Sequence, residues 1–189
     1  TPTHYSHMVA RVLERPLPVP VVFNSGGYDS VSTLQRLAGK VDIYLPDLKY
    51  LDSAPAGQYS AAPDYPAVAA AAIREMVRQT GPCVFDENGL LKKGVIIRHL
   101  VLPGQAEGAR RVMDWVAREF PKGTVLFSLM SQYTPYGRAD QFPEINRKLR
   151  RGEIRAVQDY MAALGLDGFT QERTSAAREY TPPFDLSGL

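Results

Sequence analysis

Residues 41–49 read VDIYLPDLK, a largely apolar run that ends in a carboxylate and an ammonium side chain. Its β-branched and aromatic residues, without polar alternation, predict a strand buried on both faces of a parallel sheet. Asp47 and Lys49 lie two apart, so on an extended chain they point to the same side. Strand ends are where α/β folds bind ligands. The pair predicts a polar or zwitterionic ligand; the alternative is a surface ion pair of little energetic value.

Three further segments repeat this pattern of an apolar run followed by polar side chains. They are 24–28, 98–104 and 131–133. Because the carboxyl ends of parallel strands meet at one edge of a sheet, four such ends in order predict one shared ligand site. Each segment alone also has a purely structural explanation: a β-to-α turn, an ion pair on the outer layer, and a tyrosine that covers the barrel mouth.

The side chains in these segments suit different parts of a ligand. Asn24 and Ser25, followed by two glycines, offer short polar groups and close backbone approach to a phosphate or carboxylate. Arg98 presents a planar fork for carboxylate or phosphate, and the next residue, a histidine, points to the opposite face, so at most one of them faces into a barrel. Gln132 and Tyr133 offer an amide and a flat ring, which suit the edge and face of a purine.

Composition narrows the class of protein. A chain of 189 residues is expected to form one domain with a sizeable core. The net charge of +2 gives no support for a nucleic-acid or membrane surface, and no apolar run approaches the ~20 residues of a membrane span. The first eleven residues lack a signal-peptide core. A single cysteine, Cys83, excludes an internal disulfide framework and fits a reducing compartment, so we expect a cytoplasmic protein.

The pattern along the chain predicts strands alternating with helices. Helices are expected over 3–14, 31–37, 64–80, 107–120 and 152–164, strands over 19–23, 41–45, 95–102, 124–130 and 168–170, and a hairpin over 83–91. This order predicts an α/β fold: the carboxyl-terminal portion of a partial TIM-like (β/α) barrel with four or five mainly parallel strands and flanking helices. Residues 48–64 are expected to form a loop with small helical turns. Asp64 is expected to cap the helix that follows it.

Two regions are expected: a domain over 1–175 and a tail over 176–189. The chain does not begin with Met, and its first residues read as a helix already begun. We interpret this as a piece of a longer protein or as a chain from which a tag has been removed.

Taken together, the strand-end segments resemble the carboxyl-terminal part of the radical S-adenosylmethionine proteins, in the pyruvate formate-lyase activating enzyme-like group. The order and spacing of the segments carry the resemblance, which spans about residues 1–170. The matching phrases are 23–28, 41–50, 98–104 and 129–133, with 59–66 in addition.

The resemblance implies a partial (β/α)6 barrel whose amino-terminal part carries a Cys-x-x-x-Cys-x-x-Cys loop with a [4Fe-4S] cluster. In this family the cluster cleaves S-adenosylmethionine, and the resulting 5′-deoxyadenosyl radical abstracts hydrogen. Activating enzymes take that hydrogen from a glycine of a partner protein. The implied partners are therefore the missing amino-terminal half of the same barrel and a glycyl radical protein or another protein or peptide substrate.

The resemblance also implies seven cofactor-binding residues. They are Asn24 and Ser25 near the methionyl end of S-adenosylmethionine, Asp47 and Lys49 as an Asp-x-Lys facing it, Arg98 near the ribose or substrate, and Gln132 and Tyr133 near adenine. Asp47 is further implied to help hold a monovalent cation. No residue of this chain is assigned a catalytic or metal-ligating role.

One departure from the family changes the expected chemistry. Cys83 is the chain's only cysteine, so three cysteinyl ligands cannot be assembled from it. We expect a fragment of a radical enzyme, inactive alone, whose uncovered strand edges favour self-association. The alternative is a cluster-less module that binds S-adenosylmethionine or another nucleotide. A third interpretation, an aldolase-like barrel with Lys49 as Schiff-base nucleophile, is disfavoured because such a nucleophile must lose its proton, and a neighbouring carboxylate favours the protonated amine.

Overall fold

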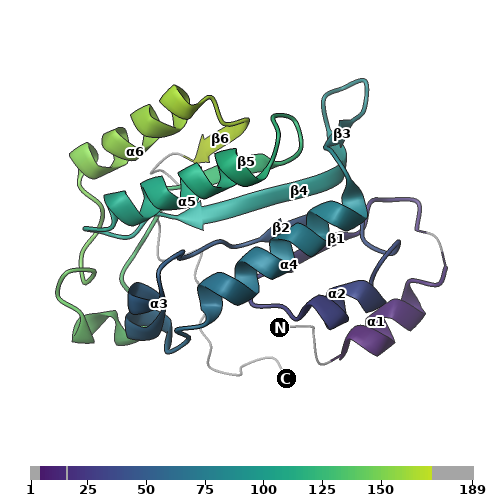
Figure 1. The fold of residues 1–189 in the computed structure, drawn as a ribbon, viewed down its shortest axis with the longest axis horizontal. Coiled ribbons are helices and arrows are strands. Elements are labelled where there is room, and N and C mark those ends of the chain that lie inside the picture. The colour runs from purple at the N-terminus through teal and green to yellow at the C-terminus, as the bar shows by residue number, and fades with distance from the viewer. Residues whose placement is uncertain (1–4, 16, 172–189) are drawn as a thin grey trace.

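Five parallel strands and one short antiparallel strand form a single sheet (Figure 1). In this computed structural model residues 5–15 and 17–171 are described. The sheet order is β1-β2-β4-β5-β6, with β3 paired antiparallel to β4. The strands are β1 (Val22–Ser25), β2 (Ile43–Pro46), β3 (Val84–Phe85), β4 (Leu91–Leu100), β5 (Leu126–Met130) and β6 (Gly168–Gln171). This is the mainly parallel α/β architecture that the alternation of elements predicts.

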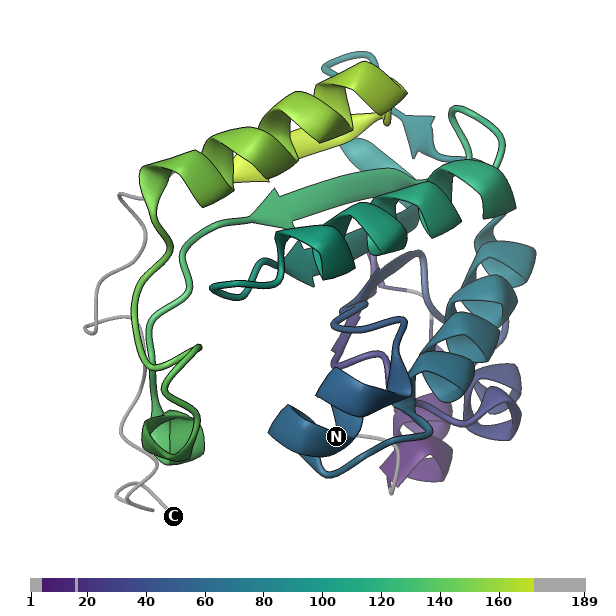
Figure 2. The same cartoon turned by 60° about the vertical axis from the view of Figure 1, so that its left-hand side comes forward.

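Helices connect the parallel strands and cover one face of the sheet. Figures 1 and 2 both place α4, α5 and α6 along that face. The helices are α1 (Ser6–Val12), α2 (Val31–Arg36), α3 (Ser53–Ser60), α4 (Tyr65–Thr80), α5 (Ala106–Glu119) and α6 (Arg151–Leu164), with a 3-10 helix η2 (Gly137–Gln141). The core lies between these helices and the sheet, where Ile73, Met76 and Val112 are fully buried.

Alternation along β4 sets which side chains face the core. Val95, Ile97 and His99 are buried in the helix-covered layer. The residues between them, Arg98 among them, are half-buried on the other face. Because successive strand residues point to opposite faces, His99 lies under α4, α5 and α6, and Arg98 lies on the opposite face of the sheet.

Strand β1 starts at Val22, three residues after the expected start at Val19. Pro18 and Pro20 precede it, and proline has no N–H to donate to a strand ladder. Asn24 and Ser25 therefore belong to the strand itself. They alternate faces, with Asn24 exposed and Ser25 buried.

Other element boundaries also differ from expectation. The second arm of the hairpin and the next strand form one continuous strand, β4, while the first arm is β3. Strand β4 passes through Gly94, where an added Cβ would lie 2.8 Å from the Cys83 sulfur. Helix α3 lies within the expected loop. Helix α1 ends at Val12 rather than at residue 14, and positions 3 and 4 of the expected helix lie outside the described residues. Asp64 precedes α4, but its side chain makes no capping hydrogen bond to the helix. Its carboxylate accepts a hydrogen bond from the Tyr28 hydroxyl instead. The predicted tail at 176–189 lies outside the described residues.

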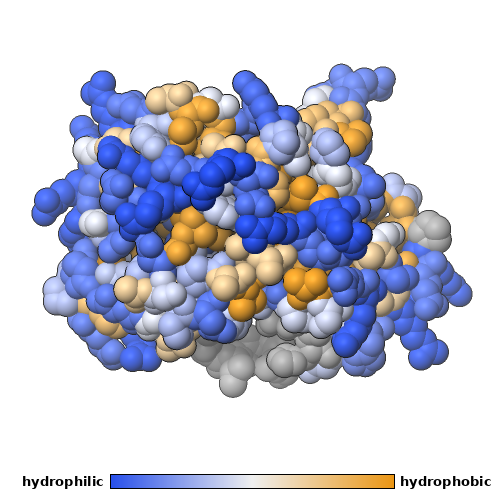
Figure 3. All heavy atoms as spheres, viewed as in Figure 1, coloured by the Kyte–Doolittle hydropathy of each residue, from blue (hydrophilic) through white to orange (hydrophobic). Residues whose placement is uncertain are grey.

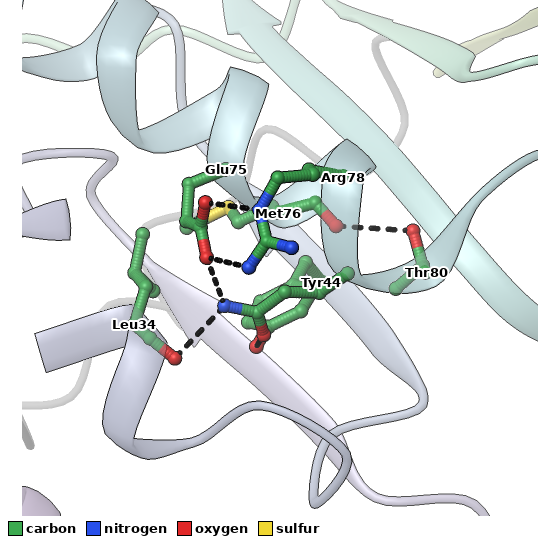
Figure 4. A network of polar contacts seen from close by, with 7 residues as sticks. Leu34, Tyr44, Glu75, Met76, Arg78 and Thr80 are labelled. Carbon is green, nitrogen blue, oxygen red and sulfur yellow. Dashed lines mark hydrogen bonds and ion pairs between the residues drawn. The ribbon is translucent and has the colours of Figure 1, made fainter. Parts of the chain in front are cut away.

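A polar network fixes α4 against α2 and β2 (Figure 4). The buried carboxylate of Glu75 accepts hydrogen bonds from Arg78 at 2.7 Å and from Gln79 at 2.7 Å. The Gln79 amide also donates to the Leu34 carbonyl at 2.9 Å and accepts from the Tyr44 hydroxyl at 2.6 Å. The Arg78 guanidinium lowers the pKa of Glu75, so the network holds its carboxylate ionised.

The start of α2 provides a stability test. The Ser30 hydroxyl accepts a hydrogen bond from the Thr33 backbone N–H at 3.2 Å, as expected for an N-cap. Ser30→Ala is expected to lower the free energy of unfolding by about 1 kcal/mol, because that N–H loses its acceptor. Urea unfolding measures the change, and Ser53→Ala, on an exposed position of α3, is the control. Equal stability of the two variants contradicts the assigned cap.

The helix-covered side is largely hydrophilic at its surface (Figure 3). An apolar patch lies at the β3–β4 hairpin, where Val84, Phe85 and Leu90 are exposed. Over residues 5–15 and 17–171, no helix combines the length and apolarity needed to cross a bilayer.

Candidate functional site

Side chains from three neighbouring parallel strands meet on the face of the sheet opposite to α4, α5 and α6. Asp47 follows β2 and pairs with Arg98 of β4, with Arg98 Nη2 2.7 Å from Asp47 Oδ1. The same nitrogen donates to Asn24 Oδ1 of β1 at 2.7 Å. The ion pair is partly exposed, 25% for Arg98 and 22% for Asp47, so its stabilising value is modest. Its effect is geometric: one guanidinium ties three strand ends together.

The loop after β1 packs directly onto the backbone at the end of β2. Gly27 has φ +78°, and a Cβ there would lie 2.1 Å from the Asp47 carbonyl oxygen. Only glycine fits this position, because it has no Cβ and tolerates positive φ. The adjacent Ser25 hydroxyl accepts from the Gly27 N–H at 3.1 Å and holds the turn.

Tyr65, at the start of α4, fastens the two strand ends. Its hydroxyl lies 2.9 Å from the Gly26 carbonyl and 2.8 Å from the Asp47 carbonyl, and it accepts from the Lys49 N–H at 3.1 Å. The pKa of Tyr65 is raised, mainly by burial. The phenol therefore stays protonated and can donate a hydrogen bond to these carbonyls. The backbone on either side of Asp47 is thereby held in place.

A cavity of about 270 Å³ opens beside the ion pair. Its volume is near the lower end of the range for small-molecule sites, roughly 300–1,000 Å³. Its walls are formed by Asp47, Lys49, Tyr50, Ser60, Leu100, Leu102 and Met130. Asp47 and Lys49 therefore border the same cavity. Asp47 forms its ion pair with Arg98.

Three predicted site residues remain: Ser25, Gln132 and Tyr133. Ser25 is buried on the helix-covered face, opposite to Asn24. Gln132 and Tyr133 follow β5 and are half-buried, and Tyr133 packs against the core. Among the described residues, the cavity wall includes Met130 of β5 but neither of these two. Their role as ligand contacts stays a prediction.

His99 has a structural position. Its Nδ1 donates to the Leu48 carbonyl at 2.7 Å, and its ring stacks on Phe127 with centroids 6.4 Å apart. Burial lowers the pKa of His99 to about 4, so the imidazole is neutral at pH 7. This agrees with the expectation that only one of Arg98 and His99 faces the open side of the sheet.

The residues of this chain do not fit an iron–sulfur cluster. Cys83 lies near the amino end of β4, beside Gly94, with its sulfur 3.5 Å from the Thr124 carbonyl. Arg98 lies toward the other end of the same strand. Within the described part of the chain, no group of three or more His, Cys, Asp or Glu side chains is arranged to hold a metal ion.

Two residues that position the site, Gly27 and Tyr65, are not indicated by the sequence pattern. Gly27 lies inside a predicted segment, but its contact partner, the Asp47 carbonyl, is twenty positions away. Tyr65 follows a predicted helix start, and nothing in its neighbours indicates that its hydroxyl reaches two strand ends. Both depend on contacts between distant segments, which periodicity does not encode.

Part of the chain is similar in sequence to a longer protein. No protein-family model matches the chain. A relative in Methanocaldococcus jannaschii, named uncharacterized protein MJ0674, is 29% identical over 150 residues, which are 79% of this chain and 40% of the relative. The chain therefore spans less than half the length of that relative.

A solved structure shares the architecture. It is a domain of pyruvate-formate lyase-activating enzyme from Bacteroides vulgatus ATCC 8482, with a TM-score of 0.65 and 14% sequence identity. The match covers 90% of this chain and 94% of that one. The likeness is one of fold: a mostly parallel sheet with flanking helices, as in that activating-enzyme domain.

Proposed function

We propose that this chain is the S-adenosylmethionine-contacting, carboxyl-terminal part of a radical S-adenosylmethionine enzyme resembling the pyruvate formate-lyase activating enzymes. The observation that carries the proposal is the Asn24–Arg98–Asp47 linkage at the ends of three parallel strands, next to a cavity that Lys49 also borders. The fold shared with an activating-enzyme domain supports it.

The cavity residues suit the zwitterionic end of S-adenosylmethionine. The Asp47 carboxylate would accept from the α-ammonium group, and the exposed Lys49 ammonium would pair with the α-carboxylate. Arg98 keeps the Asp47 carboxylate oriented, and Asn24 anchors that arginine. Gln132 and Tyr133 are proposed to contact the adenine. When bound, S-adenosylmethionine supplies the sulfonium that a radical enzyme cleaves.

The iron–sulfur cluster is proposed to be bound outside this chain, because Cys83 alone cannot hold it. The proposed partner is therefore the rest of the same barrel, in a longer protein, with a glycyl radical protein or another polypeptide as substrate. Self-association of this chain through β1 and β6, the outer strands of the sheet, is proposed in the absence of that partner.

Asp47→Asn tests the ligand site. The variant is expected to bind S-adenosylmethionine at least about tenfold more weakly in titration calorimetry, because a charge-assisted hydrogen bond to the ammonium becomes a neutral one. Asp159→Asn removes the same charge from an exposed position of α6 and is expected to bind like the unmodified chain. Equal binding by both variants contradicts the role of Asp47.

The lone cysteine favours one alternative, a cluster-less binding module. Such a module is expected to bind S-adenosylmethionine in the isolated chain, and to bind adenosine or ATP as well. Joining the chain to the rest of its longer protein distinguishes the two functions. Cleavage of S-adenosylmethionine under reducing, anaerobic conditions supports the enzyme part, and binding without cleavage supports the module. No binding in either setting overturns both.

A further inference from the structure

Four tyrosine rings lie in succession along the carboxyl ends of the strands. The ring centroids are 5.9 Å apart for Tyr28 and Tyr65, 5.8 Å for Tyr65 and Tyr50, and 6.5 Å for Tyr50 and Tyr59. These separations are those of aromatic rings in contact. Tyr50 also forms part of the cavity wall. The four residues, called here the tyrosine stack, thus connect the cavity with two ends near the surface.

The tyrosine at each end of the stack donates a hydrogen bond from its hydroxyl to a carboxylate. The Tyr28 hydroxyl lies 2.8 Å from each carboxylate oxygen of Asp64. The Tyr59 hydroxyl lies 2.9 Å from Oε1 of Glu144. Loss of one electron makes a phenol strongly acidic, so a tyrosine is oxidised more easily when a base takes its proton at the same moment. An ionised carboxylate is such a base.

The two middle tyrosines have weaker proton acceptors. The Tyr65 hydroxyl faces the carbonyl oxygens of Gly26 and Asp47, and the Tyr50 hydroxyl faces the Ser60 hydroxyl at 3.1 Å. Neither a carbonyl nor a hydroxyl takes up a proton readily near pH 7. A middle tyrosine that has lost an electron is therefore less stable than an oxidised tyrosine at either end. The oxidising equivalent moves outward.

We propose that the tyrosine stack conducts one-electron oxidising equivalents from the cavity to its ends, and that Tyr59 is the nearer terminus. A one-electron oxidant in the cavity, such as an aromatic cation radical, gains one electron and returns to its neutral form, and Tyr50 loses that electron. Tyr59 then returns an electron to Tyr50 and passes its hydroxyl proton to Glu144. The products are the reduced oxidant, a neutral tyrosyl radical at Tyr59 and a protonated Glu144. This function goes beyond ligand binding and does not depend on which ligand occupies the cavity.

Tethered photo-oxidation tests the path. A ruthenium polypyridyl oxidant is attached to a Met130→Cys variant that also carries Cys83→Ser, which places the label on the cavity wall. After a flash with an electron acceptor, tyrosyl radicals are captured by a nitroso spin trap and located by peptide mass spectrometry. Adducts are expected on Tyr59 and Tyr28. If the Met130 variant does not fold, Leu102→Cys, on the same wall, replaces it.

Variants separate conduction from direct oxidation. Tyr50→Phe is expected to abolish the adduct on Tyr59, and Glu144→Gln to move adduct from Tyr59 to Tyr28. Tyr160 is the matched control, because its hydroxyl donates to Asp114 at 2.7 Å but its ring is outside the stack. An adduct on Tyr160 equal to that on Tyr59, or a Tyr59 adduct that persists undiminished in Tyr50→Phe, overturns the proposal.

Discussion

Replacing Gly27 with alanine is expected to lower the free energy of unfolding by about 3 kcal/mol and to weaken S-adenosylmethionine binding. The new Cβ would lie 2.1 Å from the Asp47 carbonyl oxygen, so one of the two strand ends must move. Overpacking of this kind costs roughly 1–3 kcal/mol, and the positive φ adds about 1 kcal/mol. Because the displaced carbonyl belongs to Asp47, the carboxylate that faces the cavity moves with it.

Two other glycines, Gly26 and Gly39, make the test specific. Gly26→Ala places a methyl group in open space, without a positive φ, and is expected to change stability little. Gly39→Ala has φ +75° and no atom within 4 Å, so it reports the cost of the backbone conformation alone. Urea unfolding and calorimetry on the three variants separate strain from collision. If Gly27→Ala is no less stable than Gly39→Ala, the contact with Asp47 is not the cause.

The second large effect is a loss of stability at acid pH that depends on His99. Burial lowers the pKa of His99 to about 4 in the folded chain, against an ordinary value near 6.5 when unfolded. The unfolded state therefore takes up a proton first as pH falls, and folding loses free energy from about pH 6.5 down to about pH 4. By linkage, about 2 kcal/mol is lost between pH 7 and pH 5, and about 3 kcal/mol by pH 4.

His99→Asn is the variant that isolates this dependence. Its amide nitrogen can still donate to the Leu48 carbonyl, but it does not titrate. The variant is expected to be less stable than the unmodified chain at pH 7, since it loses the ring that stacks on Phe127, yet to lose less stability on acidification. Chemical unfolding at pH 7, 6 and 5 compares the two slopes. Parallel slopes contradict a neutral buried imidazole.

Much of the architecture was predictable from local patterns. Apolar runs such as 41–45 indicate buried strands, and the helices between them require parallel pairing with crossovers. The Ser30 cap and the hairpin turn at Gly89 follow from side-chain chemistry within a few residues. Some boundaries differ from the prediction. Strand β1 starts later because two prolines precede it, and α3 forms over a segment that has no periodic apolar face.

The candidate site, like the fold, was predictable from the sequence in part. The sequence by itself determined that Asn24, Asp47 and Arg98 come at successive strand ends, and hence at one edge of the sheet. Only the tertiary structure decided that one guanidinium joins the other two, that Ser25 turns to the opposite face, and that Tyr65 and Gly27 fix the backbone of Asp47. The physical reason is range: propensity and periodicity act over a few neighbouring residues, whereas these contacts join segments 18 to 74 positions apart.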